Sequence, residues 1–261
     1  MKHILHEASD EFADYLRESA RPLASLLLIA PLLMVYETTA ALHPDMTRSV
    51  TESWLHSILR LTGLRWVDGS PILLPLFVCV AIGCAHYVTR RPYRIPWRLT
   101  PAMFCEAVLG GILLVILLQS LASMYARFSM GGYVPPLTIN PATATSLGSG
   151  WHSAFSYIGS GLYEELIFRA MMITPIAWCL KRLGETHRMS LVAAVTVSSL
   201  LFALAHYQTM NVTREQFQWF TFSFRMLAGL LFSALYIKRG LGITVGAHVA
   251  YDMIVALNSN G

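Results

Sequence analysis

The sequence has 261 residues, of which 55% are hydrophobic and 13% are charged, and its formal net charge is +4. Soluble globular domains usually contain roughly 25% charged residues, so this chain has about half the usual share. The composition excludes a disordered protein, a highly charged nucleic-acid-binding arm and a small disulfide-stapled secreted domain. We therefore expect a protein that lies mostly in a lipid bilayer, has membrane lipids as partners and does not bind nucleic acid.

Residues 1–21 contain mixed charges and predict an amphipathic helix along the cytoplasmic surface of the membrane. Several of their apolar or small residues fall on one helical face: Ile4, Leu5, Ala8, Phe12, Tyr15, Leu16 and Ser19. A helix of this kind buries one face at the boundary between lipid headgroups and acyl chains. The following residues, 22–261, predict a single multi-span membrane domain.

Seven apolar segments follow, and most have about the 20 residues that a helix needs to cross the hydrocarbon core. They are 22–43, 71–89, 102–125, 153–180, 189–208, 217–237 and 242–257. Residues 44–70 show helical spacing over too short a length to cross, which predicts a helix at the membrane interface. The stretch 126–150 is rich in glycine and proline at its start and predicts a loop. The sequence thus predicts an all-α, polytopic transmembrane bundle of about seven spans.

Positive charges concentrate on one side of these segments. Twelve of the 19 Lys and Arg residues fall on the side of the N-terminus: Lys2, Arg17, Arg21, Arg90, Arg91, Arg94, Arg98, Lys181, Arg182, Arg188, Lys238 and Arg239. Because the cytoplasmic loops of membrane proteins are enriched in Lys and Arg, this side is predicted to be cytoplasmic. We expect a multi-pass protein of the bacterial inner (cell) membrane with its N-terminus in the cytoplasm.

Ionisable residues inside the apolar segments are the strongest indication of function. A charged side chain at the bilayer centre costs roughly 2.5–3.5 kcal/mol on insertion scales, so each one needs a structural or chemical reason. The charged residues inside the segments are Glu37, Glu106, Glu164, Glu165, Arg169, Arg225 and Asp252, and the last three segments add His206 and His248. Two adjacent carboxylates, two histidines and a further acid within one small bundle favour a reactive site over simple packing.

Helical spacing separates the two adjacent glutamates. Glu165 and Arg169 are four residues apart, so they share a helix face and can form an ion pair. Glu164 points about 100° away around the helix. Its carboxylate is therefore predicted to face a different neighbour and to be available for chemistry.

Two further pairs have the same spacing. His248 and Asp252 are four residues apart, so the carboxylate is expected to hold one imidazole nitrogen and orient the other. Phe202 lies one turn before His206 and is expected to pack against its ring.

These residues form motifs that resemble those of a known family. The motifs are Glu164-Glu165-x-x-x-Arg169, Phe202-x-x-x-His206 and His248-x-x-x-Asp252. In type, order and placement on three separate spans they are similar to the EExxxR, FxxxH and HxxxN/D motifs of the CAAX-protease and bacteriocin-processing (CPBP, abortive-infection-like) family. The resemblance covers roughly residues 150–257.

The resemblance implies a glutamic intramembrane endopeptidase that cleaves a membrane-anchored protein or peptide and needs no cofactor. Glu164 would be the general base for a water held between it and His206. His248 and Asp252 would stabilise the oxyanion that develops on the scissile carbonyl. Relatives often have Asn where this chain has Asp252, and an ionised Asp cannot donate. We therefore expect Asp252 to orient His248 and the imidazole to be the donor.

The resemblance also implies a role for the other polar residues of the first motif. Glu165, also counted among the catalytic residues, and Arg169 would brace the fourth helix and tune the basicity of Glu164.

Two other classes of function remain open from the sequence. A zinc-dependent membrane metalloprotease could use the same His and Glu residues as ligands, although no HExxH motif is present. A non-enzymatic membrane scaffold or immunity protein could use them as a structural network. A transporter would show paired halves or broken helices in corresponding positions, which this sequence lacks.

The charge distribution also predicts which membrane face the site approaches. If the fourth segment begins outside near Trp151, Glu164 lies about 20 Å along the helix from that end and about 25 Å from Lys181. His206 lies close to the outer end of the fifth segment. The site is therefore expected to lean toward the exoplasmic face.

Overall fold

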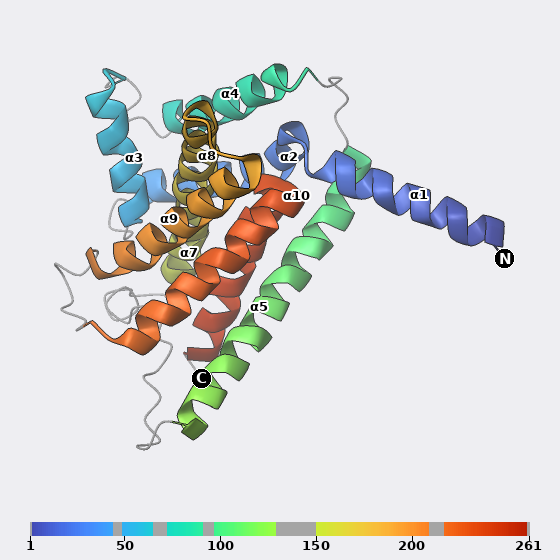
Figure 1. Ribbon diagram of the computed structural model, residues 1–261. Helices are drawn as coiled ribbons and strands as arrows, with labels where there is room; N and C mark the ends of the chain where they lie inside the picture. Colours follow the sequence, from blue (N-terminus) through green and yellow to red (C-terminus); the bar gives the residue numbers. More distant parts are fainter. Residues whose placement is uncertain are drawn as a thin grey trace.

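The computed structural model describes residues 2–43, 49–64, 72–90, 97–128, 150–208 and 217–259. Every regular element in these ranges is a helix, which confirms the predicted all-α bundle (Figure 1). The elements are α1 Lys2–Ser19, α2 Pro22–Leu42, α3 Val50–Leu61, α4 Leu73–Val88, η2 Trp97–Leu99, α5 Thr100–Phe128, α7 Gly150–Glu165, η3 Leu166–Ile173, α8 Thr174–Arg182, α9 His187–Gln208 and α10 Trp219–Ser259.

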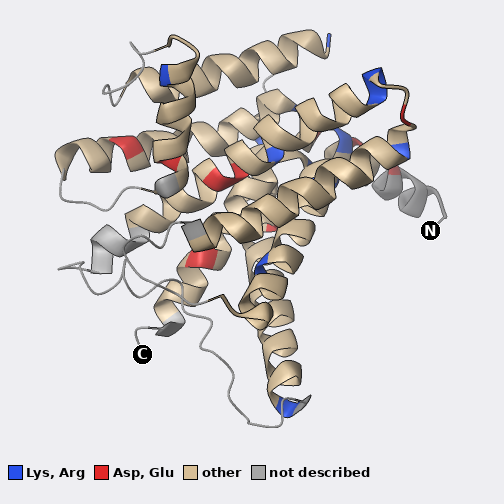
Figure 2. Cartoon of the chain, turned by 60° about the vertical axis from the view of Figure 1, so that its left-hand side comes forward, with Lys and Arg blue, Asp and Glu red and all other residues tan. Residues whose placement is uncertain are grey.

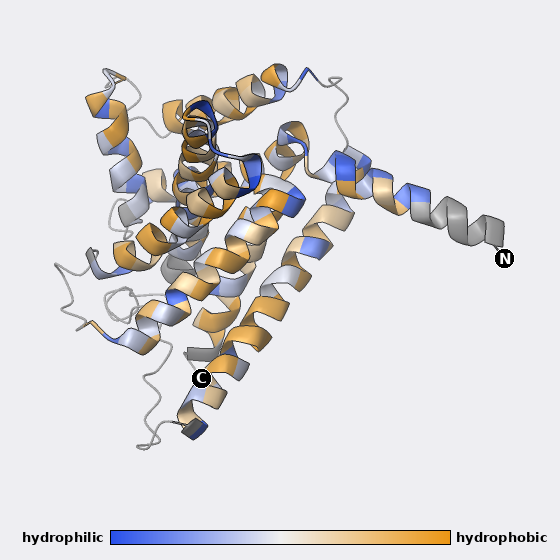
Figure 3. Ribbon diagram, in the orientation of Figure 1, coloured by the Kyte–Doolittle hydropathy of each residue, from blue (hydrophilic) through white to orange (hydrophobic). Residues whose placement is uncertain are grey.

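The predicted apolar segments coincide with these helices. Four stretches, 22–42, 97–127, 187–207 and 219–257, are long and apolar enough to cross a membrane, and α4 is a shorter apolar helix. The fourth predicted segment is divided among α7, η3 and α8, which follow one another without a break. Apolar residues dominate α5, α9 and α10 (Figure 3), while most Lys and Arg lie toward helix ends (Figure 2). The arrangement is that of an integral membrane protein.

Helix α10 is a hairpin of two antiparallel arms, residues 219–239 and 241–259. The backbone leaves helical geometry at Gly240, where φ is 78° and ψ is 173°. The rings of Phe232 and His248 stack with centroids 4.3 Å apart, whereas sixteen residues of straight helix would separate them by about 24 Å. The chain therefore reverses at Gly240, and the sixth and seventh predicted segments are separate helices, as expected.

The segment predicted to be an interfacial helix forms α3, which packs against the bundle. Leu55 and Leu59 of α3 belong to the main buried cluster, together with residues of α2, α4 and α7. Glu52 of α3 is also buried and accepts a hydrogen bond from Tyr36 of α2 at 2.5 Å. These contacts join α3 to the core, and its position at the membrane interface stays a prediction. Residues 44–48 and 65–71 of this segment, and 129–149 of the predicted loop, lie outside the described residues.

The predicted N-terminal helix is present as α1, and a cluster of polar side chains joins its end to the bundle. Arg239, just before the α10 turn, donates to both carboxylate oxygens of Glu106 in α5, at 2.5 and 2.6 Å. It also donates to the Leu16 carbonyl and to Ser19 Oγ, each at 2.9 Å. Tyr15 donates to Glu106, and burial together with this carboxylate raises the pKa of Tyr15 to about 12. Tyr15 therefore remains a donor at neutral pH.

We expect Gly240→Ala to destabilise the protein more than Gly184→Ala. Both glycines have positive φ, which costs an alanine about 1–2 kcal/mol. A Cβ at Gly240 would also lie 2.7 Å from the Ala20 carbonyl oxygen, whereas one at Gly184 meets nothing within 4 Å. Thermal unfolding of both variants in detergent measures the difference, and equal losses would contradict the close packing of the turn.

Candidate active site

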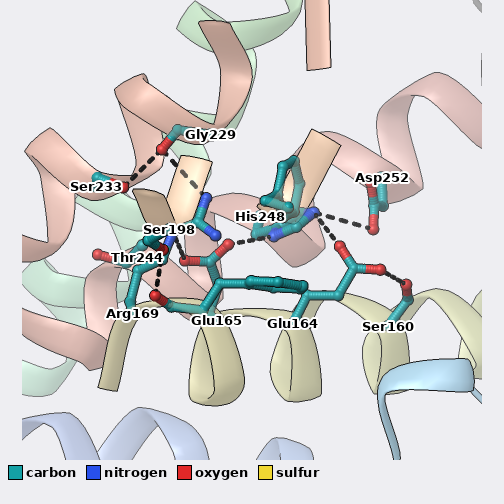
Figure 4. Close-up of polar contacts among 12 residues, drawn as sticks. Ser160, Glu164, Glu165, Arg169, Ser198, Gly229, Ser233, Thr244, His248 and Asp252 are labelled. Carbon is teal, nitrogen blue, oxygen red and sulfur yellow. Dashed lines mark hydrogen bonds and ion pairs between the residues drawn. The ribbon is translucent and has the colours of Figure 1, made fainter. Parts of the chain in front are cut away.

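The motif residues come from three parts of the bundle and meet inside it. Glu164 and Glu165 end α7, Arg169 lies in η3, and the second arm of α10 supplies His248 and Asp252 (Figure 4). The third part is the end of α9, whose Phe202 and His206 pack against this group.

Glu165 is the central anchor of the cluster. Its Oε2 lies 3.1 Å from Arg169 Nε, and both side chains have no solvent exposure. This ion pair confirms the partner predicted from the four-residue spacing. Its other oxygen, Oε1, accepts a hydrogen bond of 2.7 Å from His248 Nδ1. Glu165 thus joins α7 to both η3 and the second arm of α10.

The guanidinium of Arg169 is held on several sides. It donates to the Gly229 carbonyl at 3.3 Å. Its Cζ lies over the ring of Phe202 at 4.6 Å and over that of Phe232 at 5.7 Å. The aromatic faces add a favourable electrostatic attraction to a cation that has left water. Arg169 therefore connects η3 to α9 and to the first arm of α10.

The helix carrying Arg169 has π geometry, which the sequence did not predict. Eight residues, Leu166–Ile173, form η3 directly after the two glutamates. Ser198 of α9 donates its hydroxyl to the Phe168 carbonyl within this segment. Helical turns of this kind are rare and occur often at functional sites. No local signal in the apolar run LIFRAMMI distinguishes a π-helix from an α-helix.

Glu164 has a more open environment than Glu165. Its Oε1 accepts a 2.7 Å hydrogen bond from Ser160, one turn earlier in α7. Its Oε2 lies 3.7 Å from His248 Nε2, and its side chain keeps 12% exposure. As the spacing predicted, Glu164 is not the partner of Arg169. The sequence analysis did not predict Ser160. Its position four residues before Glu164 places the two side chains on the same helix face, so the spacing indicates this contact.

His248 has a hydrogen-bonding partner that was not predicted, in addition to the predicted neighbour Asp252. Asp252 Oδ2 lies 3.6 Å from His248 Nε2, which is too long for a hydrogen bond. The hydrogen bond that orients the ring comes from Glu165 at Nδ1, and Phe232 stacks on the ring face. Asp252 is thus within ion-pair distance of His248, as the four-residue spacing indicated, and its role in orienting the ring stays a prediction. Nε2 is left facing the two carboxylates of Glu164 and Asp252.

His206 lies beside the same cluster. Its Nδ1 donates to the Phe202 carbonyl at 2.8 Å, so in the neutral ring Nε2 carries the lone pair. The Phe202 ring lies edge-on to His206 at 4.8 Å, as predicted, and 6.2 Å from His248. Glu164 and His248 both act electrostatically on His206. Both histidines therefore lie next to the ring of Phe202.

A second polar cluster behind α7 was missed by sequence reasoning. Tyr163 donates to Glu37 of α2, and the rings of Tyr163 and Tyr36 meet edge to face at 5.8 Å. A Cβ at Gly159 would lie 2.1 Å from the Tyr36 ring, so only glycine allows this approach. Glu37 was recognised as an acid inside a span, but its partner lies 126 residues away in sequence.

A catalytic zinc site needs three converging protein ligands, usually His, Cys, Asp or Glu side chains. Within the described ranges, no group of three or more His, Cys, Asp or Glu side chains is arranged to bind a metal. The Nδ1 atoms of both site histidines are used in protein hydrogen bonds, so Nε2 is the nitrogen of each ring that could coordinate a metal. The zinc alternative therefore receives no specific support from the arrangement of the described side chains.

The protein is thus a helical membrane bundle that contains a buried cluster of Glu, Arg and His side chains. Residues 146–254 match the family described as type II CAAX prenyl endopeptidase Rce1-like. The match confirms the resemblance seen in the three motifs, and all of the motif residues lie within the matched segment. The chain matches no curated protein and no solved structure. The family match supports a protease at the general level.

We expect Arg169→Ala to lower stability strongly, because it leaves Glu165 as a buried charge without its guanidinium. Breaking a buried ion pair from one side costs about 3–5 kcal/mol. The matched control is Arg188→Ala, which removes an exposed arginine at the start of α9. Unfolding of the two variants in detergent makes the comparison, and an unchanged midpoint for Arg169→Ala would show that the pair has no bracing role.

Proposed function

We propose that this protein is a glutamic intramembrane endopeptidase that cleaves a membrane-associated protein or peptide. The observation that carries the proposal is the difference between its two adjacent glutamates. Glu165 is fully buried and bonded to Arg169 and His248. Glu164 keeps some exposure, and among the described residues Ser160 is its one hydrogen-bonding partner. One carboxylate is thus structural, and its neighbour is available to accept a proton. The family match supports the reaction class.

In the proposed reaction, Glu164 removes a proton from a water held between it and His206. The resulting hydroxide attacks the scissile carbonyl carbon and forms a tetrahedral intermediate. The proton on Glu164 then passes to the leaving amine nitrogen as the carbon–nitrogen bond breaks, so one water is consumed for each peptide bond. Ser160 holds the other oxygen of Glu164 and keeps Oε2 directed toward His248.

His248 is the proposed oxyanion donor. Its Nδ1 is fixed by Glu165, so the ring orientation is set before the substrate arrives, and Nε2 is the nitrogen left to face the reacting atoms. A donor that is already oriented stabilises a developing charge without the cost of reorganisation. Asp252, beside Nε2, would offset positive charge on the ring while that nitrogen carries a proton.

We further propose that the reaction needs no metal and that the protein lies in a bacterial inner membrane with its N-terminus in the cytoplasm. The first proposal is supported by the absence of converging ligands among the described side chains. The second is supported by the twelve positive charges on the N-terminal side. On that orientation, the end of α9 near His206 faces the exoplasm, so substrate would be cut toward that face.

We expect Glu164→Gln to reduce cleavage at least about 100-fold, the usual loss when a general base is removed. The fold should survive, because Glu164 is not part of the Glu165–Arg169 pair. The measurement is turnover of a prenylated peptide ending in a CAAX sequence by protein reconstituted in liposomes. Glu185→Gln, in the exposed turn between α8 and α9, is the matched control. Undiminished turnover by Glu164→Gln would refute the mechanism.

Chelation is expected to leave this turnover unchanged, and purified protein should contain no stoichiometric zinc. Elemental analysis and assays before and after treatment with a strong chelator measure both quantities. Zinc at one equivalent, together with activity that chelation removes and added zinc restores, would favour the metalloprotease mechanism instead.

A further inference from the structure

The π-helix η3 sets the angle between the two residues of the buried ion pair. Glu165 ends α7, and Arg169 is the fourth residue of η3. A π-helix forms its backbone hydrogen bonds to the fifth residue along the chain, so each residue turns less around the axis than the roughly 100° of an α-helix. Over the four residues from Glu165 to Arg169 this difference adds up to about 70°. The direction of the Arg169 side chain therefore depends on the π geometry of η3.

The direction of Arg169 matters because its guanidinium has partners on several helices. It lies 3.1 Å from Glu165 of α7, donates to the Gly229 carbonyl of α10 and lies over the ring of Phe202 of α9. A rotation of about 70° would carry the guanidinium away from these partners. Glu165 would then lose the cation that offsets its buried charge, and this carboxylate is the group that fixes the His248 ring.

Ser198 of α9 contacts the backbone of η3 at the residue before Arg169. Its hydroxyl donates to the Phe168 carbonyl, and Ser198 has no solvent exposure, so water cannot take its place. Inside a membrane bundle, backbone groups that are freed by a departure from α-helical geometry are satisfied by neighbouring helices and by Ser and Thr side chains. The hydroxyl thus stabilises a carbonyl within the π turn that directs Arg169.

The next residue of α9 holds this helix closely against the first arm of α10. The hydroxyl of Ser199 lies 3.5 Å from that of Ser233. Ser233 donates at 2.7 Å to the Gly229 carbonyl, which also accepts a hydrogen bond from Arg169 (Figure 4). A Cβ at Gly229 would lie 3.1 Å from the Ser199 Cα, so the two helices are in close contact there. The position of Ser198 is therefore closely defined relative to the carbonyl that Arg169 must reach.

We propose that Ser198 is a positioning residue, whose hydroxyl keeps η3 in the π geometry that directs Arg169 toward Glu165. Glu165 in turn orients His248, the proposed oxyanion donor, so the inference rests on the proposed function. Ser198 acts on the reaction through these residues, while its own hydroxyl is bonded to the Phe168 carbonyl. Its loss should therefore slow the chemical step and leave substrate affinity unchanged.

The position of the Arg169 guanidinium can be measured without turnover. The ion pair with Glu165 and the ring current of Phe202 give the Nε–H resonance of Arg169 a chemical shift that differs from that of exposed arginines. In protein labelled with ¹⁵N-arginine and held in nanodiscs, this resonance is assigned by its absence from Arg169→Lys. Ser198→Ala should move the resonance toward those of the exposed arginines. Ser198→Thr, which keeps the hydroxyl, should restore it.

Turnover of the prenylated CAAX peptide gives the kinetic readout. Ser198→Ala should lower kcat about 10- to 100-fold with KM unchanged, because a distant change that misplaces reacting groups by about 1 Å has an effect of this size. Ser198→Thr should recover kcat. The matched control is Ser190→Ala, which removes an equally buried hydroxyl of α9 that donates to the Thr186 carbonyl, four residues earlier. This control should leave both kcat and the Arg169 resonance unchanged.

Three results would overturn the inference. They are an unchanged Arg169 resonance or an unchanged kcat in Ser198→Ala; losses that Ser198→Thr does not restore, which would assign the effect to packing; and an equal loss of kcat in Ser190→Ala. Failure of the proposed function is seen separately, as full cleavage by Glu164→Gln. The Arg169 resonance still reports on the role of Ser198 in that case.

Discussion

The buried carboxylate of Glu165 is the interaction on which the rest of the site depends. One of its oxygens faces the Arg169 guanidinium and the other accepts the His248 hydrogen bond, with no solvent to replace either. A charge in this position is tolerated only while both partners remain in place. Because Glu165 must point toward α10, the preceding residue on the helix is turned about 100° away. The exposure of Glu164 is thus a consequence of the burial of Glu165.

The opposite face of α7 explains why this helix can hold a reactive group without shifting. Tyr163 is bonded to Glu37, and Tyr36 packs directly on Gly159. These contacts join α7 to α2, while Glu165 joins it to α10. Rigid support on both sides fixes the carboxylate of Glu164 relative to His248, and geometric precision of this kind is what a general base requires.

The features that could be predicted from the sequence were local. Hydrophobic runs located the helices, and spacing of four residues found the Glu165–Arg169 pair and the packing of Phe202 on His206. The contacts that could not be predicted join distant segments. Glu165 and His248 are 83 residues apart, so only helix packing reveals that Glu165 holds the imidazole.

The turn of the α10 hairpin has a consequence for any shortened form of the protein. Arg239 precedes the turn and donates to Leu16 and Ser19 of α1 as well as to Glu106. A chain starting at Pro22 would leave this guanidinium with Glu106 as its one remaining acceptor among these three residues. The helix at the start of the chain therefore helps to hold Arg239, at the turn of the α10 hairpin and nine residues before His248, in its position against the bundle.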